Sequence, residues 1–375
     1  MKLVFASDSF KGSLSSKKIN EILTEVTYGV LGECDIVSIP MADGGEGTLD
    51  ALCTVTGGEM VDCVVHDPLG RLIHAEYLAL SDGTAVVEMA RASGLTLLGE
   101  KERNPLKTST YGTGELILDA IKHGHRKITV TIGGSATNDG GMGCMRALGI
   151  RFLDRKNMEL SGCGEDLLRL SNIDVTGLDS DIANTDFTIM CDVTNPLCGE
   201  QGATYTFGPQ KGAWGESLEL LEQGMINYRN IIRREYGIDC DNIPGCGAAG
   251  GLGAALRIFL QGKIRSGIDT ILDLTDFDVI IRDADVIITG EGRADEQSSH
   301  GKVMHGIGLR ALKQKIPVIG ICGSVGEGAD SLYDHGITAL YATMPSDISI
   351  EEAILRAEEL YRNTAKEVLS HFFRK

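Results

Sequence analysis

The chain is poor in proline, poor in aromatic residues and free of any long apolar run. It has 8 prolines in 375 residues, and aromatic residues make up 5%; proline averages about 5% in globular proteins. No window approaches the roughly 20 consecutive apolar residues of a membrane span. The apolar stretch 3–6 meets Asp8 before a signal-like core can form. We therefore expect a folded, cytoplasmic protein without a membrane anchor.

Positive charge is also scarce, and the cysteines have no pattern. Lys and Arg number 35 against 53 Asp and Glu, which gives a net charge of −18. Nucleic-acid binding normally needs a basic face that displaces counterions, so neither nucleic acid nor an anionic membrane is expected as a partner. The ten cysteines include no Cys-x-x-Cys pair. We expect reduced, structural thiols rather than a zinc site or a disulfide framework.

Several nucleotide-binding and catalytic motifs are missing. The chain has no G-x-x-x-x-G-K-[ST] sequence and lacks the protein-kinase H-R-D and D-F-G pair. Residues 245–250 (GCGAAG) have dinucleotide-fingerprint spacing, but no strand is apparent before Pro244. His300 and His305 are five apart, which places them off one helical face. These absences argue against a P-loop enzyme, a protein kinase and a dinucleotide site. They also argue against a zinc site or a catalytic triad built on histidine.

Glycine is abundant, with 48 residues or about 13% against an average of about 7%. Short apolar runs alternate with segments of helical period, which is typical of βαβ units and a parallel sheet. Strands are expected at 3–6, 35–40, 127–132, 187–191, 286–289, 317–322 and 337–341. Hairpin turns are expected at 67–70 and 81–83, a long amphipathic helix at about 216–236 and a glycine-rich helix at about 250–261.

This order predicts an α/β protein with two dissimilar α/β domains. Both chain ends, 1–65 and 280–375, would form a flavodoxin-like parallel sheet, and 66–279 would form an inserted, Rossmann-like α/β domain. Five outer strands match the order 2-1-3-4-5, in which ligands sit where the order reverses, between the first and third strands. The residues after Phe5 should then lie beside those after Thr289.

Two junctions between a strand and a helix repeat the pattern Asp-Gly-Gly-x-Gly, at 43–47 and 139–143. Consecutive glycines let a backbone approach an anion closely, and the start of the following helix favours negative charge. The second copy is preceded by 132–138 (IGGSATN), which makes that junction more elaborate. The alternative stays open that these glycines only permit tight turns and close helix packing.

A third junction, 289–295 (TGEGRAD), adds carboxylates just past a strand end. Such positions face the ligand crevice of an open sheet, where a carboxylate can hold Mg²⁺ or accept a proton. Six acidic residues occupy them: Asp8, Asp43, Asp139, Asp192, Glu291 and Asp295. Without cations they would repel one another, and Mg²⁺ together with Lys11, Lys211, Arg293 or Lys302 would resolve the conflict. Any single acid could instead be a helix cap or a solvated turn residue.

Read together, these motifs resemble the bacterial two-domain glycerate kinase family. The runs that carry the resemblance span nearly the whole chain: 8–13 (DSFKGS), 40–48 (PMADGGEGT), 108–115 (TSTYGTGE), 133–143 (GGSATNDGGMG), 191–199 (CDVTNPLCG), 207–213 (FGPQKGA), 244–251 (PGCGAAGG) and 289–302 (TGEGRADEQSSHGK). The resemblance implies phosphoryl transfer from ATP to D-glycerate with Mg²⁺.

On this hypothesis each motif receives a role. ATP phosphates would be bound by the loop residues Gly133, Gly134, Ser135, Asn138, Asp139, Gly140 and Gly141. Glycerate would be bound by Asp8, Ser9, Lys11, Glu291 and Lys302, and the metal by Asp192 and Glu291. Lys11 and Arg293 would neutralise the carboxylate or the transferred phosphoryl group, and Asp295 or Asp43 would orient or deprotonate the attacking hydroxyl. The catalytic set is therefore Lys11, Asp43, Asp192, Arg293 and Asp295.

Three alternatives remain at this point. The same loops would serve a kinase of another small hydroxy acid, or a Mg²⁺-dependent phosphatase. A non-catalytic metabolite sensor would also bind phosphate, although simple binding has no use for so many carboxylates. Residue spacing does not distinguish the 2-hydroxyl from the 3-hydroxyl of glycerate, and the resemblance favours 2-phosphoglycerate. The oligomeric state is not readable from the sequence, and a homo-oligomer stays open.

Overall fold

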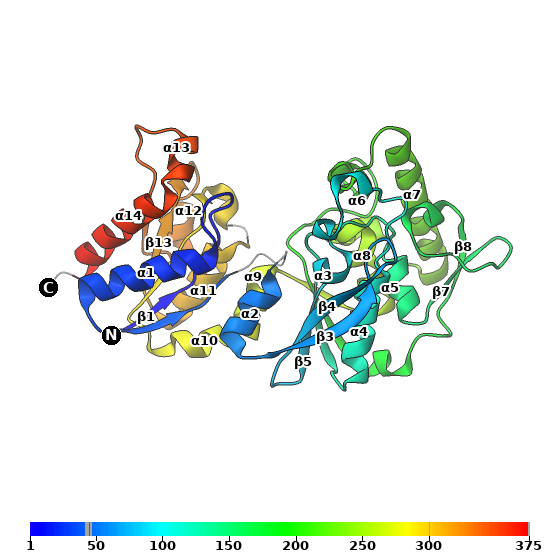
Figure 1. Ribbon diagram of the computed structural model, residues 1–375, viewed down its shortest axis with the longest axis horizontal. Coiled ribbons are helices and arrows are strands. Elements are labelled where there is room, and N and C mark those ends of the chain that lie inside the picture. Colours follow the sequence, from blue (N-terminus) through cyan, green and yellow to red (C-terminus); the bar gives the residue numbers. More distant parts are fainter. Residues whose placement is uncertain (42–44, 46, 300, 374–375) are drawn as a thin grey trace. The chain divides into compact units, whose positions relative to one another are not determined.

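The computed structural model describes residues 1–41, 45, 47–299 and 301–373. It divides into two compact units (Figure 1), the first made of Met1–Asp43, Asp50–Gly57 and Gly267–Lys375, and the second of Gly44–Leu49 and Gly58–Ser266. The expected boundaries, 65/66 and 279/280, lie later in the chain. The strand β3 (Glu59–His66) belongs to the sheet of the second unit, and the helix α9 (Gly267–Leu274) packs on a helix of the first unit. The chain therefore passes from one unit to the other earlier than expected at both boundaries.

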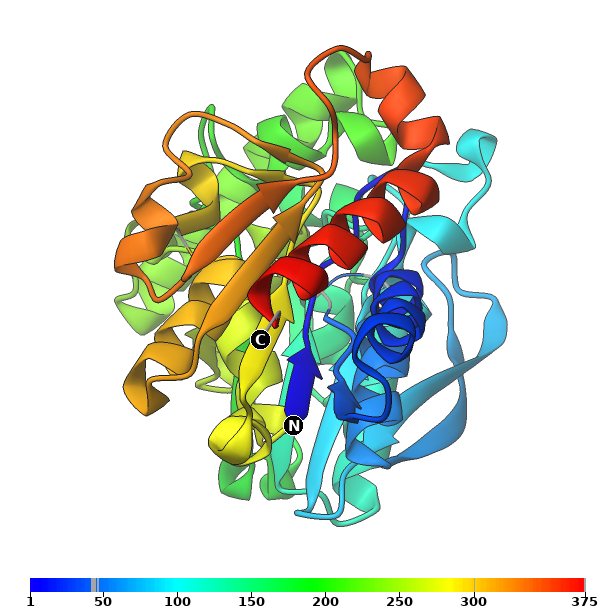
Figure 2. The ribbon, with the colours of Figure 1, turned by 90° about the vertical axis from the view of Figure 1, so that its left-hand side faces the viewer.

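The first unit contains a five-stranded sheet in the order β15-β13-β11-β1-β2 (Figure 2). Its strands are β1 (Lys2–Phe5), β2 (Asp35–Ser38), β11 (Val286–Thr289), β13 (Val318–Cys322) and β15 (Ala339–Ala342). Every pairing is parallel, and β1 pairs with β11 from Leu3 opposite Val286. In chain order this is 2-1-3-4-5, so the predicted flavodoxin-like topology is confirmed.

Helices cover both faces of this sheet because apolar residues recur on one side of each. In α1 (Ser16–Leu31), Ile19, Ile22 and Leu23 are fully buried, and Ser15 caps the helix by accepting a hydrogen bond from Lys18 N. α1 packs against α14 (Ala357–Phe372). Other helices of this unit are α10 (Phe277–Ile280), α11 (Val303–Gln314), α12 (Ser331–Asp334) and α13 (Ile350–Leu355).

The last helical segment differs from its expected form. In the sequence, Ser349-x-x-Glu352 is a capping-box pattern, and Ile354 and Leu355 share a helical period with later apolar residues, which predicts one helix with these side chains along one face. Ser349 does accept a hydrogen bond from Glu352 N at 3.2 Å. The helix is interrupted at Arg356, which has φ −102° and ψ 14°, and Leu355 is 87% exposed. The interruption changes the direction of the buried face, so the expectation for these two side chains was wrong.

The second unit has a six-stranded sheet in the order β10-β9-β6-β5-β4-β3. Its other strands are β4 (Leu72–Ala79), β5 (Thr84–Glu88), β6 (Lys127–Thr131), β9 (Asp186–Met190) and β10 (Lys263–Arg265). The pairs β3–β4 and β4–β5 are antiparallel, which confirms the two predicted hairpins, and the other pairs are parallel. The sequence did not predict β10 or the hairpin of β7 (Arg151–Asp154) and β8 (Leu170–Asp174).

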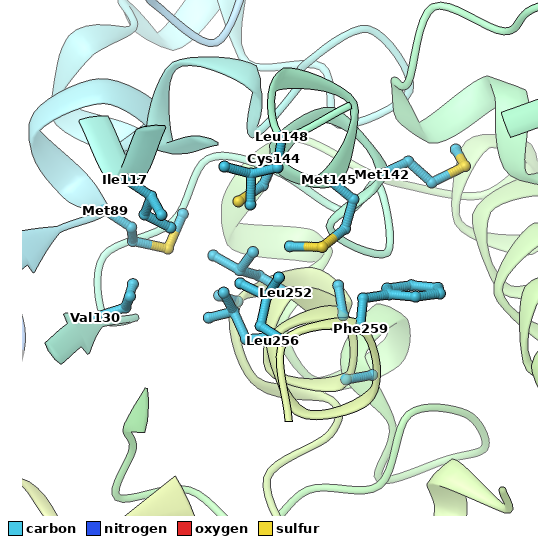
Figure 3. Packing of buried hydrophobic residues seen from close by; sticks show 14 of the residues in the cluster. Met89, Ile117, Val130, Met142, Cys144, Met145, Leu148, Leu252, Leu256 and Phe259 are labelled. Atoms are coloured by element: carbon cyan, nitrogen blue, oxygen red, sulfur yellow. The ribbon is translucent and has the colours of Figure 1, made fainter. Parts of the chain in front are cut away.

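Two of the helices in this unit are α4 (Tyr111–Lys122) and α7 (Glu216–Tyr236), and α7 has the bounds that its pattern predicts. The others are α3 (Ala90–Ser93), α5 (Met142–Ala147), α6 (Ala203–Phe207) and α8 (Leu252–Phe259). Figure 3 shows Cys144 and Met145 of α5 facing Leu252 and Leu256 of α8 in the core. This packing fixes the position of α5, whose first residue follows the glycine-rich loop.

Two expectations drawn from composition can be checked directly. All ten cysteines are free thiols, as expected. Throughout the described parts of the chain, we find no helix with the length and apolar character needed to cross a bilayer.

Candidate functional site

In the second unit, the glycine-rich loop 133–141 connects β6 to α5. Ser135 forms an antiparallel bridge with Gly94, and Leu95 N donates to the Gly134 carbonyl at 2.8 Å. Gly134 is exposed with φ +73°, Gly133 is half-buried, and Ser135 is only 8% exposed. The part of the loop that can meet a ligand directly is therefore its first three residues.

Asp139 lies in the interior and is fully hydrogen-bonded. Its carboxylate accepts from Thr110 N and Thr110 Oγ1, both at 2.8 Å, from Gly141 N at 2.9 Å and from Gly143 N at 3.2 Å. It is 0% exposed, and burial raises its pKa while these hydrogen bonds oppose the rise. Asp139 therefore fixes the start of α5, and the expectation that it faces a ligand crevice is not met.

The glycines after Asp139 serve close packing. A Cβ at Gly140 would lie 2.8 Å from the ring of Tyr228, and one at Gly250 would lie 2.1 Å from the Thr137 carbonyl oxygen. Both glycines have positive φ, at +65° and +63°. Gly140 N donates to the Gly250 carbonyl at 2.9 Å, so the loops 133–141 and 245–251 lie against each other. Close packing, rather than the approach of an anion, therefore accounts for glycine at these two positions.

Lys211 lies beneath the loop and holds it at two points. Its Nζ donates to Ser135 Oγ at 2.8 Å and to the Thr137 carbonyl at 2.6 Å. The residue is 1% exposed, and burial lowers its pKa to about 7, against the opposing attraction of Asp139. Asn138 links the loop to α6, because its Nδ2 donates to Thr204 Oγ1 at 3.1 Å.

The lowered pKa of Lys211 predicts a pH dependence of stability. Between about pH 7 and its ordinary value of 10.5, the unfolded chain binds more protons than the folded one, so the free energy of unfolding rises with pH in this window. Lys211→Met should lack this contribution. We expect urea unfolding from pH 7 to 9 to show the wild type gaining stability relative to Lys211→Met. Parallel pH curves for the two proteins would contradict the burial of a titrating ammonium.

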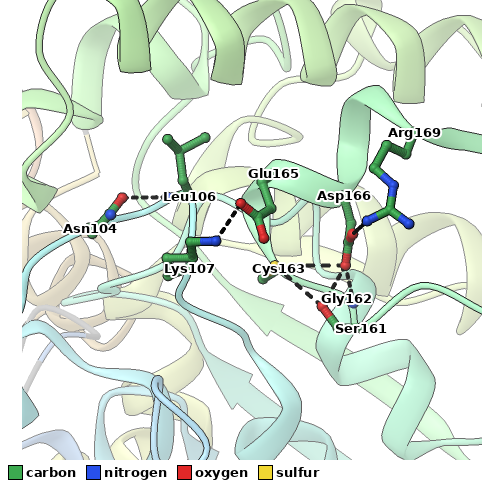
Figure 4. A network of polar contacts seen from close by, with 9 residues as sticks. All are labelled: Asn104, Leu106, Lys107, Ser161, Gly162, Cys163, Glu165, Asp166 and Arg169. Carbon is green, nitrogen blue, oxygen red and sulfur yellow. Dashed lines mark hydrogen bonds and ion pairs between the residues drawn. The ribbon is translucent and has the colours of Figure 1, made fainter.

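The segment 104–110 also supports the loop. Thr108 Oγ1 donates to the Ala136 carbonyl at 3.0 Å, directly beside the residue that Lys211 binds. Figure 4 shows how this segment is anchored: Lys107 Nζ donates to Glu165 Oε2 at 2.6 Å. Glu165 N donates in turn to the Leu106 carbonyl at 2.9 Å. In the sequence this segment was notable only as part of a matching run, because its contacts are all distant along the chain.

Asp192 lies at the same edge of the second sheet as the loop. It follows β9, which pairs in parallel with β6 from Lys127 opposite Asp186 to Thr131 opposite Met190. Carboxyl ends of parallel strands meet at one edge, so the topology brings Asp192 to the end of the sheet where the loop begins. Its side chain is exposed. This placement suits contact with a ligand or with a hydrated ion.

In the first unit, the segments after β1 and β11 are neighbours, as the topology predicts. Asp8 N donates to the Gly290 carbonyl at 2.8 Å, and Thr289 Oγ1 donates to the Ala6 carbonyl at 2.7 Å. Ser9 N donates to Asp8 Oδ1 at 2.7 Å, and the side chain of Lys11 is exposed. The predicted glycerate residues after β1 are thus placed where the strand order reverses.

Glu291 brings this group together. It is 6% exposed, and burial raises its pKa, as do the charges of Asp8 and Asp295, while Lys302 lowers it. Lys302 Nζ lies 3.7 Å from Glu291 Oε2. Among the residues that the structure describes, none forms a hydrogen bond with the buried Glu291 Oε1. Glu291 therefore lies within electrostatic reach of Asp8 and Asp295, two other predicted site carboxylates of this unit.

Arg293 and Asp295 form an ion pair beside Glu291, with Nε 3.2 Å from Oδ2. Asp295 Oδ1 accepts from Gln297 N at 3.0 Å, and Ser298 Oγ donates toward the Arg293 carbonyl at 3.4 Å. The guanidinium side is open to solvent, since the Arg293 side chain is 66% exposed. Asp43, the remaining predicted catalytic residue, lies outside the described residues.

Glu88 is a residue that the sequence reasoning missed. It ends β5, it is 1% exposed, and its carboxylate accepts from Gly47 N at 3.1 Å and Leu49 N at 3.0 Å at the start of α2 (Thr48–Thr56). Arg91 Nε lies 3.9 Å away. The amide of Gly47, which belongs to the glycine pattern expected to face an anion, is thus bound by a carboxylate of the protein itself. The signal in the sequence is a glutamate that closes a buried strand.

Comparison with known proteins decides the family. A family model described as the glycerate kinase family matches residues 3–372. The chain belongs to this family. Among its relatives, a glycerate kinase of Bacillus subtilis (strain 168) is 44% identical over 369 residues, covering 98% of this chain and 97% of the relative. A glycerate 2-kinase of Escherichia coli (strain K12) is 42% identical, with 94% and 93% covered.

A solved structure has the same architecture. The crystal structure of a candidate glycerate kinase 2 from Salmonella typhimurium LT2 superposes with a TM-score of 0.85 at 40% identity, covering 99% of this chain and 98% of that one. The members of the glycerate kinase family are kinases that transfer a phosphoryl group to an alcohol. Family membership thus selects the kinase among the alternatives that the sequence left open.

Among the described residues, the carboxylates of this glycerate kinase family member do not build a dedicated metal cage. In the ranges that the structure describes, no three His, Cys, Asp or Glu side chains are grouped as metal ligands. Mg²⁺ in phosphoryl-transfer enzymes is usually held by one or two carboxylates together with substrate phosphates and water. An exposed Asp192 fits that mode of binding.

Proposed function

We propose that this protein transfers the γ-phosphoryl group of ATP to the 2-hydroxyl of D-glycerate, with Mg²⁺, to give 2-phosphoglycerate. The single observation that carries the proposal is the exposed start of the loop 133–141, which is backed by the buried ammonium of Lys211. Family membership and the relative named glycerate 2-kinase support the choice of acceptor and hydroxyl.

The second unit would bind ATP. Gly133 and Gly134 offer backbone N–H groups at the surface, and Ser135 offers a hydroxyl beside a positive charge, which together suit phosphate oxygens. The other residues assigned to ATP are buried and would act by holding the loop in shape: Asn138, Asp139, Gly140 and Gly141. This division of roles refines the assignment drawn from the sequence.

The first unit would bind glycerate, a small anion with one carboxylate and two hydroxyls. Lys11, Arg293 and Lys302 supply positive charge for the carboxylate or for the transferred phosphoryl group. Asp8, Ser9 and Glu291 supply acceptors for hydroxyl groups. Glu291 Oε1, which is buried and has no hydrogen-bond partner among the described residues, fits a hydroxyl donor, because a buried acceptor without a partner is costly.

Mg²⁺ fits Asp192 better than Glu291. An exposed carboxylate can accept a hydrated ion, whereas Glu291 is buried beside Lys302, which already supplies a positive charge. When bound, Mg²⁺ neutralises charge that develops on the phosphate oxygens. Asp192 would hold the ion directly or through water.

Asp295 would orient the attacking hydroxyl or take its proton, with Asp43 as the other candidate. Its ion pair with Arg293 fixes the carboxylate, and Gln297 N holds one of its oxygens, so the group is preorganised. Phosphoryl transfer needs little covalent chemistry from the protein, so alignment and charge neutralisation are the main contributions expected of these residues.

Phosphorus NMR of the reaction products tests the proposal. With ATP, Mg²⁺ and D-glycerate we expect ADP and a phosphate resonance that matches 2-phosphoglycerate. 3-Phosphoglycerate would overturn the assignment of the hydroxyl. Phosphate release without a new ester would favour a hydrolase, and nucleotide binding without any product would favour a sensor. A panel of other small hydroxy acids, assayed in parallel, tests the choice of acceptor.

A further inference from the structure

A buried ammonium is expensive unless its charge is balanced, and that of Lys211 is not balanced by an ion pair. Nζ is hydrogen-bonded to two neutral oxygens, Ser135 Oγ and the Thr137 carbonyl. In the described part of the chain, no carboxylate forms a salt bridge with it, and Asp139 acts on it only by longer-range attraction. Proteins rarely keep such a charge without a counter-charge from a ligand or a partner.

The hydroxyl of Ser135 connects this charge to the surface. Its oxygen accepts from Lys211, so its own proton is left to donate elsewhere, and within the described residues Ser135 Oγ has no acceptor for that proton. Ser135 is 8% exposed and follows the exposed Gly134. A hydroxyl that accepts from an ammonium is a stronger donor to an anion, because the two hydrogen bonds polarise each other.

We propose that Lys211 is a positioning residue of the nucleotide site: its buried ammonium orients the Ser135 hydroxyl toward a nucleotide phosphate and supplies, through that hydroxyl, the counter-charge of the phosphate. The inference rests on the proposed binding of ATP by the second unit. It explains why a lysine is kept in the interior, where methionine would pack with no charge to bury. The Thr137 bond fixes the ammonium so that the direction of the hydroxyl is set before a ligand arrives.

Nucleotide binding should be accompanied by proton uptake at Lys211. Lys211 has a pKa of about 7 without ligand, and a bound phosphate favours the charged form, so nucleotide binding above pH 7 should draw a proton onto the protein. Asp139 is the charged group that faces Lys211 from the loop. The neighbouring Gly212 lies against the backbone of Arg103, the other charged residue beside this segment.

The test measures equilibrium binding of ADP with Mg²⁺, without glycerate, by isothermal titration calorimetry. Lys211→Met should weaken ADP binding by about 10- to 100-fold, the loss expected for a hydrogen bond to a charged group. Ser135→Ala should weaken it to a similar degree. Lys211→Arg keeps the charge and should retain more affinity than Lys211→Met. The exposed Lys156→Met in the same unit should bind ADP as the wild type does.

Proton uptake gives a second reading that a structural role would not produce. Titrations at pH 8 in two buffers of different ionisation enthalpy should show uptake of a fraction of a proton by the wild type and less by Lys211→Met and Lys211→Arg. If Lys211→Met does not fold, wild-type proton uptake and the Ser135→Ala affinity decide the question. Unchanged ADP affinity in both Lys211→Met and Ser135→Ala would overturn the inference, as would wild-type binding without proton uptake.

The inference and the proposed function fail in different ways. Wild-type enzyme that phosphorylates glycerate but binds ADP independently of Lys211 and Ser135 would refute only the role of Lys211. Lys211-dependent ADP binding without turnover of D-glycerate would refute the proposed acceptor and leave the role of Lys211 intact. No binding of ADP by the folded wild type would refute both.

Discussion

Replacement of Asp295 by asparagine is expected to lower kcat for D-glycerate phosphorylation by about 10²- to 10⁴-fold, the usual contribution of a group that accepts a proton in the transition state. The substitution is nearly isosteric, and the amide oxygen can still accept from Gln297 N, which lies 3.0 Å from Oδ1. It removes the negative charge that faces Arg293 at 3.2 Å. The KM for glycerate should change less than kcat, because the carboxylate is assigned to the reacting hydroxyl rather than to the substrate carboxylate.

Steady-state kinetics of the purified variants check this result. Asp347→Asn, an exposed aspartate in the same unit, is the matched control and should retain wild-type kcat. Asp192→Asn should also lower kcat, with partial recovery at higher Mg²⁺, because its assigned role is to hold the ion. If Asp295→Asn and Asp192→Asn both stayed within a few-fold of the wild type, the assignment of roles would be wrong.

The topology of the first sheet was readable from the sequence because each strand is a short apolar run with a helical segment after it. Such runs admit few arrangements, since parallel connections are right-handed and order reverses at one point. That alone placed Asp8 beside Gly290, across 282 positions of chain, and the 2.8 Å hydrogen bond from Asp8 N to the Gly290 carbonyl bears it out. Strand order follows from the alternation of apolar runs and helical segments, and this alternation is visible in a single sequence.

The contents of the site were harder to read, because they depend on distant partners. Asp139 and Asp192 look alike in the sequence, each being an aspartate just after a strand. In the structure four donors from residues 110, 141 and 143 surround Asp139, whereas Asp192 is exposed. Nothing local distinguishes them. The difference arises from where residues 108–110 cross the loop.

Lys211 and Glu88 are buried charged residues whose partners, like those of Asp139, lie far away in the sequence. Lys211 looked like one of several lysines that a phosphate site could use, and its two contacts lie 74 and 76 positions away. Glu88 looked like the end of a strand, yet it binds amides 41 and 39 positions earlier. Charged residues are costly to bury, so a burial pattern that included them could not be inferred from hydrophobic periodicity.

Asp139→Ala should produce the largest loss of stability among the loop residues, about 3–5 kcal/mol in the free energy of unfolding. The substitution leaves four buried donors without their acceptor, and each unsatisfied buried group costs about 1–3 kcal/mol, with part of the sum recovered by water or local rearrangement. Asp139→Asn keeps one acceptor oxygen and should lose less than half as much. The variants thus separate the hydrogen bonds from the charge.

Urea unfolding followed by circular dichroism gives the stability, and hydrogen exchange localises the change. The amides of Thr110, Gly141 and Gly143, which donate to Asp139, should lose protection in Asp139→Ala before the rest of the unit does. Asp154 is the matched control, since it accepts from Lys156 N at 2.7 Å and Met158 N at 2.9 Å in an exposed turn. Water can replace its carboxylate there, so Asp154→Ala should lose far less stability. If the two alanine variants were equally destabilised, Asp139 would not be what holds the loop to α5, and the geometry of the loop in the proposed ATP site would need another support.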